Sequence, residues 1–347
     1  MSKQENNLNP FVNQDKNIEA KQDAIFETIS QDVPVAEELI QDIISVNTSY
    51  VDNIVLDLNK VSNIAFNPEK NLALYKGNLQ RIAMERKGSK KEINALVSIN
   101  FDSKAMKEKG LSIHGTEKLA PFDKIVLDAV NTLYFEGHNE YITTDMVFHV
   151  MTGNINKRIT PKYSEEINNS LIKLLFTHIT IEASEEAQMY PNLKDFKYDS
   201  TILPGDMVRA KLNGTEVACI HIYKTPPLYL YANHKNQISK VDITLLQKPF
   251  AKGIHENQES MTLLHYLLRR IIAVKSLSNA IKYDTLYHDF GYEEAGKQYK
   301  LFFRKKIKAI LDAWKGSIFG DIKFLDYSEK KLGRTPYEII LNCKYLK

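Results

Sequence analysis

A row of cationic side chains recurs at helical spacing between residues 293 and 318 of this 347-residue sequence. A row of apolar and aromatic residues follows the same period beside it, which predicts a helix with two neighbouring faces. Between Lys297 and Lys308 there are six basic residues and no acidic residue. A helix that buries one face and presents cations on the next is suited to contact phosphate groups. The cationic row comprises Lys297, Lys300, Arg304, Lys308 and Lys315, with Lys305 and Lys306 further round, and the apolar row comprises Tyr299, Phe303, Ile307, Ile310 and Trp314.

A charged face that meets only water is the alternative explanation of such a run. The distribution of charge along the chain favours a polyanion as the partner. Residues 1–69 hold 4 Lys and Arg against 12 Asp and Glu, whereas residues 70–120 hold 11 against 5 and the remainder holds 31 against 26. The formal net charge of +3 therefore conceals an acidic first segment and a basic body.

Motifs of several common enzyme classes do not occur in the sequence. A rolling-circle initiator would need two metal-binding histidines separated by one apolar residue, and His221-Ile222-Tyr223 supplies only one. There is no HExxH spacing, no Gly-x4-Gly-Lys-Ser/Thr loop and no G-x-S-x-G turn. We therefore expect no enzymatic activity, no metal site and no cofactor.

Composition indicates a soluble globular chain, with 43% hydrophobic and 26% charged residues. Cys219 and Cys343 are its two cysteines, which fits a reducing cytosol and excludes a disulfide framework or a cysteine-based zinc site. No apolar run approaches the roughly 18–20 residues of a membrane helix. The first residues also lack the basic-then-apolar pattern of a secretory signal. We expect a cytoplasmic protein without membrane contact.

Residues 1–65 predict an acidic, partly disordered helical arm. One amphipathic helix is expected to begin near Pro34, and a second follows from apolar residues at helical spacing between Val51 and Val61. This arm could dock on the body, on a second copy or on another protein. Residues 66–117 predict a basic segment, in which residues 66–94 form a linker or a short helix and residues 95–101 a strand.

Residues 118–250 predict a first winged-helix domain, in which three helices precede a β-hairpin. The first helix is expected from Pro121 to Gly137, the second ends at Gly153, and the third follows Pro161. The pair Asn213-Gly214 favours a tight hairpin turn. Residues 225–232 and 238–246 are expected to be extended.

Residues 251–347 repeat this order of elements and predict a second winged-helix domain. A buried helix at 259–276, a short helix at 283–290 and the cationic helix precede strands at 322–327 and 337–346. The sequence therefore predicts an α+β, mainly helical fold with two tandem winged-helix (helix-turn-helix plus β-hairpin) domains. The two halves share the order of elements and no residue-level repeat.

On these elements, the sequence resembles the iteron-binding plasmid replication initiators, the RepA/RepE-like family of tandem winged-helix proteins. The resemblance spans residues 118–346. A long insertion at 182–206 and the acidic arm depart from it. The local sequences that carry it are YLLRRI (266–271), YDTLY (283–287), YKLFFRKKIKAILDAW (299–314) and GRTPYEIILN (333–342).

The resemblance implies a protein that binds repeated sites in a replication origin, with a recognition helix of each domain in successive major grooves. It also implies opening of an adjacent AT-rich region for loading of a host helicase, and contacts with host replication proteins. A homodimer that represses the protein's own promoter, while the monomer initiates replication, is a further implication.

Candidate DNA contacts follow from the chemistry of the two grooves, because Lys and Arg orient a protein on phosphates while Arg, Lys, Asn and Gln read base edges. In the second domain the candidates are Lys297, Gln298, Lys300, Arg304, Lys305, Lys308, Lys315, Lys330, Lys331 and Arg334. In the first domain they are Lys157, Arg158, Lys162, Asn168, Asn169 and Lys211.

Two other functions fit the same pattern. One is a transcriptional regulator of a mobile element with these folds and no role in origin opening. The other is a module whose winged helices bind protein. Direct repeats beside an AT-rich segment near the gene would favour the initiator. A lone inverted repeat at the promoter would favour the regulator. Binding that does not weaken as salt rises would favour the protein-binding module.

Overall fold

The computed structural model describes residues 51–67, 74–75, 80–85, 92–137, 142–184, 197–212, 215–247, 257–275 and 278–346. Contacts divide the chain between Ser49 and Tyr50, and the described residues all belong to the second part, a mixed fold of helices and strands. The helix expected near Pro34 lies outside them. No helix in the described ranges has the length and apolar character needed to cross a membrane.

Three helices and a three-stranded sheet form what we call the first helix–hairpin module. Thr143 caps the second helix and Thr160 the third by accepting backbone N–H groups, and Gly153 ends the second helix with a φ of 65°. The short strand before the second helix pairs with the second strand of the hairpin, so the sheet order is β4-β8-β7. The predicted helices are therefore confirmed. The elements are α5 (Pro121–Phe135), β4 (Ile142–Thr143), α6 (Thr144–Thr152), α7 (Pro161–Phe176), β7 (Gly205–Leu212) and β8 (Thr215–Ile222).

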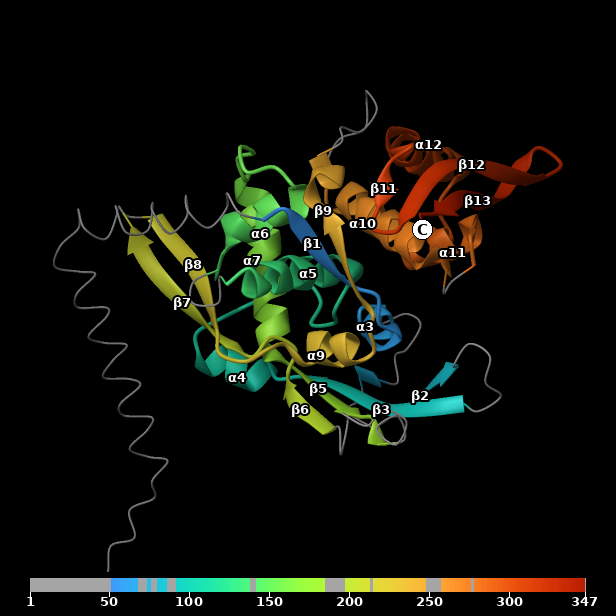
Figure 1. The fold of residues 1–347 in the computed structure, drawn as a ribbon. Coiled ribbons are helices and arrows are strands. Elements are labelled where there is room, and N and C mark those ends of the chain that lie inside the picture. Colours follow the sequence, from blue (N-terminus) through green and yellow to red (C-terminus); the bar gives the residue numbers. More distant parts are fainter. Residues whose placement is uncertain are drawn as a thin grey trace, which may run out of the picture. The chain divides into compact units, whose positions relative to one another are not determined.

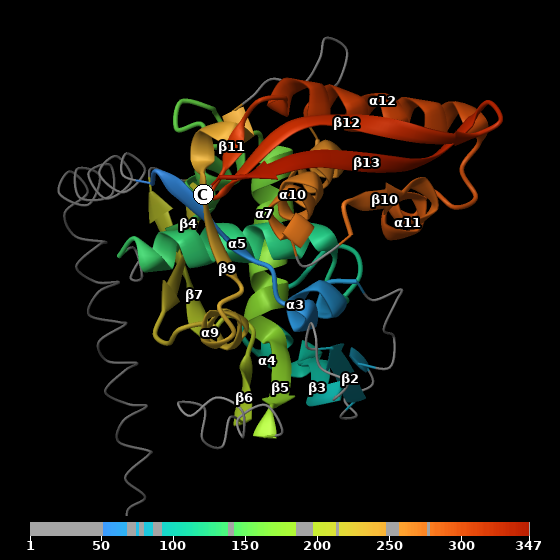
Figure 2. The same cartoon turned by 45° about the vertical axis from the view of Figure 1, so that its right-hand side comes forward.

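The second helix–hairpin module has the same order and the same strand connection. Its short strand β10 pairs with the second hairpin strand, giving the sheet order β10-β13-β12-β11. Figure 2 shows α12 running along β12 and β13. The three helices and the hairpin predicted here are confirmed. The elements are α10 (Gln258–Ile272), β10 (Ala280–Lys282), α11 (Tyr283–Asp289), α12 (Lys297–Trp314), β11 (Ile318–Phe319), β12 (Ile322–Leu332) and β13 (Thr335–Tyr345).

A further four-stranded antiparallel sheet, in the order β2-β3-β5-β6, adjoins the first module (Figure 1). The strand predicted at 95–101 is confirmed as part of β3. The segment before it, predicted as a linker or a short helix, instead contains strand β2. The insertion predicted at 182–206 supplies β6, which pairs with β5 directly after the third helix, so the insertion is part of this sheet. The elements are β2 (Gln80–Glu85), β3 (Glu92–Phe101), α4 (Ser103–Glu108), β5 (Thr177–Glu182) and β6 (Lys197–Thr201).

The helix predicted from Val51 to Val61 is wrong, because these residues form strand β1 (Asn53–Asp57) and the start of α3 (Lys60–Ala65). Strand β1 pairs with β9 (Ile238–Asp242), and Ile54, Val55 and Leu56 are all buried. A strand that is buried on both faces presents a continuous apolar run, which also satisfies a helical period. These residues belong to the core of the first module, rather than to an arm.

The extended segment predicted at 225–232 is also wrong, because Pro227–His234 forms helix α9. Pro227 occupies the first turn, where a missing N–H and a fixed φ favour helix formation. The next predicted strand divides into β9 and the 3-10 helix η2 (Ile243–Gln247).

Buried contacts join the two modules. His265 on α10 contacts the backbone oxygen of Met151 on α6 at 3.2 Å, through its Nε2. Trp314 on α12 donates its indole N–H to the backbone oxygen of Leu245 at 3.1 Å. Side chains from both modules form one continuous hydrophobic core.

Candidate nucleic-acid interface

Helix α12 packs on the second module through one face, and the prediction of that face is largely confirmed. Phe303, Ile307, Ile310 and Trp314 are buried, as expected from their spacing. Tyr299 is a correction, since 67% of its surface is exposed. It lies in the first turn of α12, where its ring reaches Tyr292 at 6.1 Å between centroids but not the core.

The cationic row predicted on α12 does not face solvent as a whole. Lys300, Arg304 and Lys308 are half-buried, because this flank of the helix leans over α11 and β12. The Lys300 ammonium donates to the backbone oxygen of Glu293 at 2.6 Å and lies 5.0 Å from the centre of the Tyr287 ring. The Arg304 guanidinium lies 5.8 Å from the centre of the Tyr283 ring. These cations therefore contact the protein itself.

Lys308 forms an ion pair with Glu329 on β12, at 2.5 Å from Nζ to Oε2. The Tyr283 hydroxyl donates to the other oxygen of the same carboxylate. Burial raises the pKa of Glu329, but the hydrogen bonds from Lys308 and Tyr283 outweigh it, so the pKa lies below its ordinary value. Glu329 thus ties α11, α12 and β12 together, and Lys308 is part of the internal structure.

Two further basic residues, one within α12 and one directly after it, are also paired. Lys315 forms ion pairs with Asp326 at 2.9 Å and Asp312 at 3.1 Å, and these hydrogen bonds raise the pKa of Lys315. Lys306, which helical spacing places further round the helix than the cationic row, is buried, and its ammonium contacts Glu259 at 2.9 Å. Helical spacing therefore identifies a row of lysines, but it does not show which of these lysines are neutralised by acidic residues nearby in the fold.

The outward face of α12, which we define as Gln298, Leu301, Phe302 and Lys305, lies opposite its buried face. All four side chains are exposed, and Leu301 and Phe302 are each 47% exposed. Lys297 is exposed in the first turn. In the part of the chain that the structure describes, Lys297, Gln298 and Lys305 form no hydrogen bond or ion pair through their side chains. The sequence prediction included these three and missed Leu301 and Phe302, although their spacing from Gln298 places them on the same face.

The hairpin of β12 and β13 carries further cations at its tip. A two-residue turn of Gly333 and Arg334 joins the strands, with a φ of 61° at Gly333 that favours glycine. Lys330 is paired with Glu338 at 3.0 Å. Lys331 and Arg334 are exposed and lack an ion pair among the described residues. Among the candidate contacts predicted in the second module, these two cations, with Lys297 and Lys305, are exposed and have no ion pair within the described ranges.

The third helix of the first module is more enclosed than expected. Residues of α4 and the following loop pack on α7, where Met106 and Leu111 contact Ile172. The side-chain oxygen of Asn169 accepts the backbone N–H of His114 at 3.4 Å, and that of Asn168 is buried. Both amide oxygens therefore lie against the protein, and the role of Asn168 and Asn169 as base readers stays a prediction.

The predicted cations of the first module have separate surroundings. Lys162 is exposed and lies 3.8 Å from Glu166 one turn later. Lys157 lies 5.8 Å from the centre of the Phe148 ring, and Arg158 is exposed. The backbone of Lys211 on β7 lies opposite that of Glu216 on β8. The Lys211 side chain and the Asn213-Gly214 turn lie outside what the structure describes.

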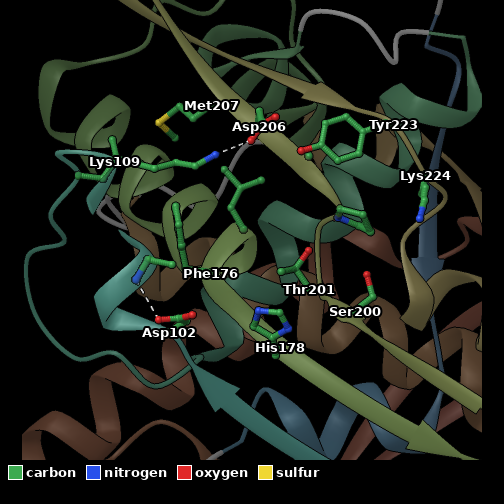
Figure 3. A pocket seen from close by; sticks show the side chains of 15 residues that line it. Asp102, Lys109, Phe176, His178, Ser200, Thr201, Asp206, Met207, Tyr223 and Lys224 are labelled. Atoms are coloured by element: carbon green, nitrogen blue, oxygen red, sulfur yellow. Dashed lines mark hydrogen bonds and ion pairs between the residues drawn. The ribbon is translucent and has the colours of Figure 1, made fainter. Parts of the chain in front are cut away.

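A cavity of about 410 Å³, lined by both apolar and polar side chains, lies beside the added sheet, between α4, β5, β6 and the start of β7 (Figure 3). The Lys109 ammonium contacts the Asp206 carboxylate at 2.8 Å. Burial raises the pKa of Asp206, but hydrogen bonds from Lys109 and Tyr223 outweigh it and hold the pKa below its ordinary value. The main charges of this cavity therefore neutralise each other. The described residues hold no group of three His, Cys, Asp or Glu side chains suited to a metal ion.

No protein-family model matches the chain. No curated protein matches it either. Among solved structures, two crystal structures of domains 2 and 3 of RctB, a replication initiator of Vibrio chromosome II, are similar to it. Their TM-scores are 0.38 and 0.39 and their identities 10% and 11%, over 77% of this chain and 91% and 92% of those chains. Because both TM-scores lie below 0.5, we base no functional conclusion on this likeness.

Proposed function

We propose that this chain is a sequence-specific double-stranded DNA-binding protein that initiates replication of a plasmid or other mobile element. It would bind repeated sites in the origin and help to open the neighbouring duplex. In this proposal the two helix–hairpin modules are winged-helix domains, and the protein has no catalytic role. A homodimer and host replication proteins are the proposed partners besides DNA.

The observation that carries the proposal is the outward face of α12 together with the tip of the β12–β13 hairpin. Exposed cations at Lys297, Lys305, Lys331 and Arg334 have no ion-pair partner among the described residues, and Gln298 is exposed on the same helix as the first two. A major groove about 12 Å wide admits one α-helix. With α12 in such a groove, hairpin cations would contact the flanking phosphates.

The repeated order of elements supports a tandem reader of DNA. Both modules place a short strand before the second helix and pair it with the second hairpin strand. The buried contacts of His265 and Trp314 connect the modules, which suits recognition of an extended or repeated site. The second module would supply the larger share of affinity, because α4 and its loop cover part of α7.

Selection of tight-binding duplexes from a random pool with the full chain tests the proposal. We expect one sequence to be enriched, to occur as direct repeats near the gene, and to bind less tightly as salt rises. Opening of an adjacent AT-rich segment, measured by reactivity of unpaired thymines, would support the initiator role. A lone inverted repeat without opening would indicate a transcriptional regulator. The absence of duplex binding would overturn the proposal.

A further inference from the structure

The outward face of α12 combines apolar and polar side chains in one short surface. Leu301 and Phe302 are each 47% exposed, and Gln298 and Lys305 lie one turn before and after them. Exposed apolar side chains on a cationic helix indicate contact with a partner that has apolar groups next to negative charge. Duplex DNA has this combination, because thymine methyl groups line the major groove between two phosphate backbones.

Building on the proposed function, we infer that α12 recognises adenine–thymine base pairs in the major groove. Leu301 and Phe302 contact thymine methyl groups, and Gln298 binds a neighbouring adenine through its N6 and N7 atoms. Glutamine matches the donor and acceptor on the major-groove edge of adenine, and apolar side chains match the methyl group of thymine. The two kinds of side chain on this face thus select the same base pair.

The position of Phe302 is partly fixed by its neighbours. The Lys306 ammonium lies 5.2 Å from the centre of the Phe302 ring and is itself paired with Glu259. A cation over one face of an aromatic ring restrains it while the rest of the ring stays exposed. Less side-chain entropy is therefore lost when Phe302 meets a base.

The charges around this face favour DNA over a protein surface. Lys305 is exposed on it and Lys297 is exposed in the first turn of the same helix, whose one acidic residue, Asp312, lies two turns beyond Lys305. The centre of a protein–protein interface is depleted of charged residues, whereas a groove-binding helix alternates cations with base-reading groups.

Replacement of thymine by deoxyuridine in the selected duplex tests the inference, because this change removes the methyl group and keeps base pairing. We expect binding to weaken about fourfold for each contacted methyl group, in line with the burial of one such group. The slope of affinity against salt should not change, since the phosphates are the same. Equal affinity for both duplexes would overturn the inference and leave the proposed function intact.

Variants separate base reading from phosphate contact. Leu301→Ala, at an exposed helical position, should reduce the preference for thymine over deoxyuridine to near unity at one position. Lys331→Ala should keep that preference and reduce the salt slope by about 0.9. Leu325→Ala, at a residue 39% exposed on β12, serves as the matched control and should change neither. If Leu301→Ala instead alters self-association in sedimentation and leaves DNA recognition unchanged, this face binds protein and the inference is wrong.

Discussion

Arg269 on α10 donates a hydrogen bond to the carboxylate of Asp128 on α5, so a buried ion pair links the two helix–hairpin modules. The Asp128 side chain is 1% exposed and that of Arg269 is 14% exposed. Asp57 and Lys124 are buried nearby, and burial raises the pKa of Asp57 to about 6 and lowers the pKa of Lys124 to about 8. The junction of the modules therefore contains several buried charged groups, and each of them is stabilised by its oppositely charged neighbours.

Arg269→Leu should destabilise the fold by about 3–5 kcal/mol, because it leaves the Asp128 carboxylate buried without its cation. Asp128→Asn should have a similar effect, and the double variant should lose less than the sum of the two. Urea titration followed by fluorescence of Trp314, the single tryptophan, measures these free energies. The exposed pair of Lys240 and Glu136, 3.8 Å apart, provides the control, with about 1 kcal/mol or less expected on its removal. Additive losses at Arg269 and Asp128 would show that the ion pair does not couple the modules.

Lys308→Ala should lower the melting temperature, because the Glu329 carboxylate would lose its cation in a largely buried position. Lys305→Ala, three residues earlier on the same helix, should leave the melting temperature unchanged and weaken binding to the selected duplex. Calorimetry and fluorescence anisotropy at several salt concentrations give the two readouts for both variants. The assignment of roles on α12 is wrong if Lys305→Ala destabilises the fold and Lys308→Ala affects DNA binding alone.

Leu56→Ala should destabilise the protein by about 2–5 kcal/mol, the usual loss for a fully buried leucine. Leu56 lies in β1, and the preceding residue Val55 donates its backbone N–H to the Thr132 hydroxyl on α5 at 2.9 Å. Removal of residues 1–65 should therefore unfold the first module, contrary to an arm that docks on the surface. Leu325→Ala is the exposed comparison, with a change within about 0.5 kcal/mol expected. A Leu56→Ala protein of wild-type stability would place β1 outside the core.

Local signals in the sequence predicted the helices well and the strands only in part. Thr143, Thr160 and Gly153 mark helix boundaries through chemistry that involves only neighbouring residues. The pairing of β1 with β9 joins residues far apart in the chain, and no local period distinguishes such a buried strand from a helix.

The candidate site shows the same limit. Helical spacing placed Lys305 and Lys308 on one cationic helix, and it could not show that Glu329 neutralises only Lys308. Glu329 comes from β12, and its distance from α12 depends on the packing of the hairpin. Predicting an exposed cation therefore requires the tertiary fold, whereas predicting a cationic helix requires only its sequence.

His265 should make the stability of the protein fall as the solution is acidified. Burial, together with the charge of Arg269, lowers the pKa of His265 to about 3, although its contact with the Met151 oxygen acts in the opposite direction. Between pH 6.5 and 3 the unfolded chain therefore binds a proton that the folded protein does not, so acidification favours unfolding. At pH 5 this amounts to about 2 kcal/mol relative to neutral pH.

His265→Gln isolates this contribution, because a glutamine amide does not titrate and can donate to the Met151 oxygen. We expect the wild-type protein to lose about 2 kcal/mol more stability than the variant between pH 7 and pH 5, measured by urea titration at each pH. The raised pKa of Asp57 acts in the opposite direction, since stability from this group falls as pH rises toward 6, but it is common to both proteins and cancels in the difference. His221→Gln, at an exposed histidine, controls for the loss of an imidazole. Parallel pH profiles for the wild type and His265→Gln would contradict a neutral, buried His265 at the junction of α10 and α6.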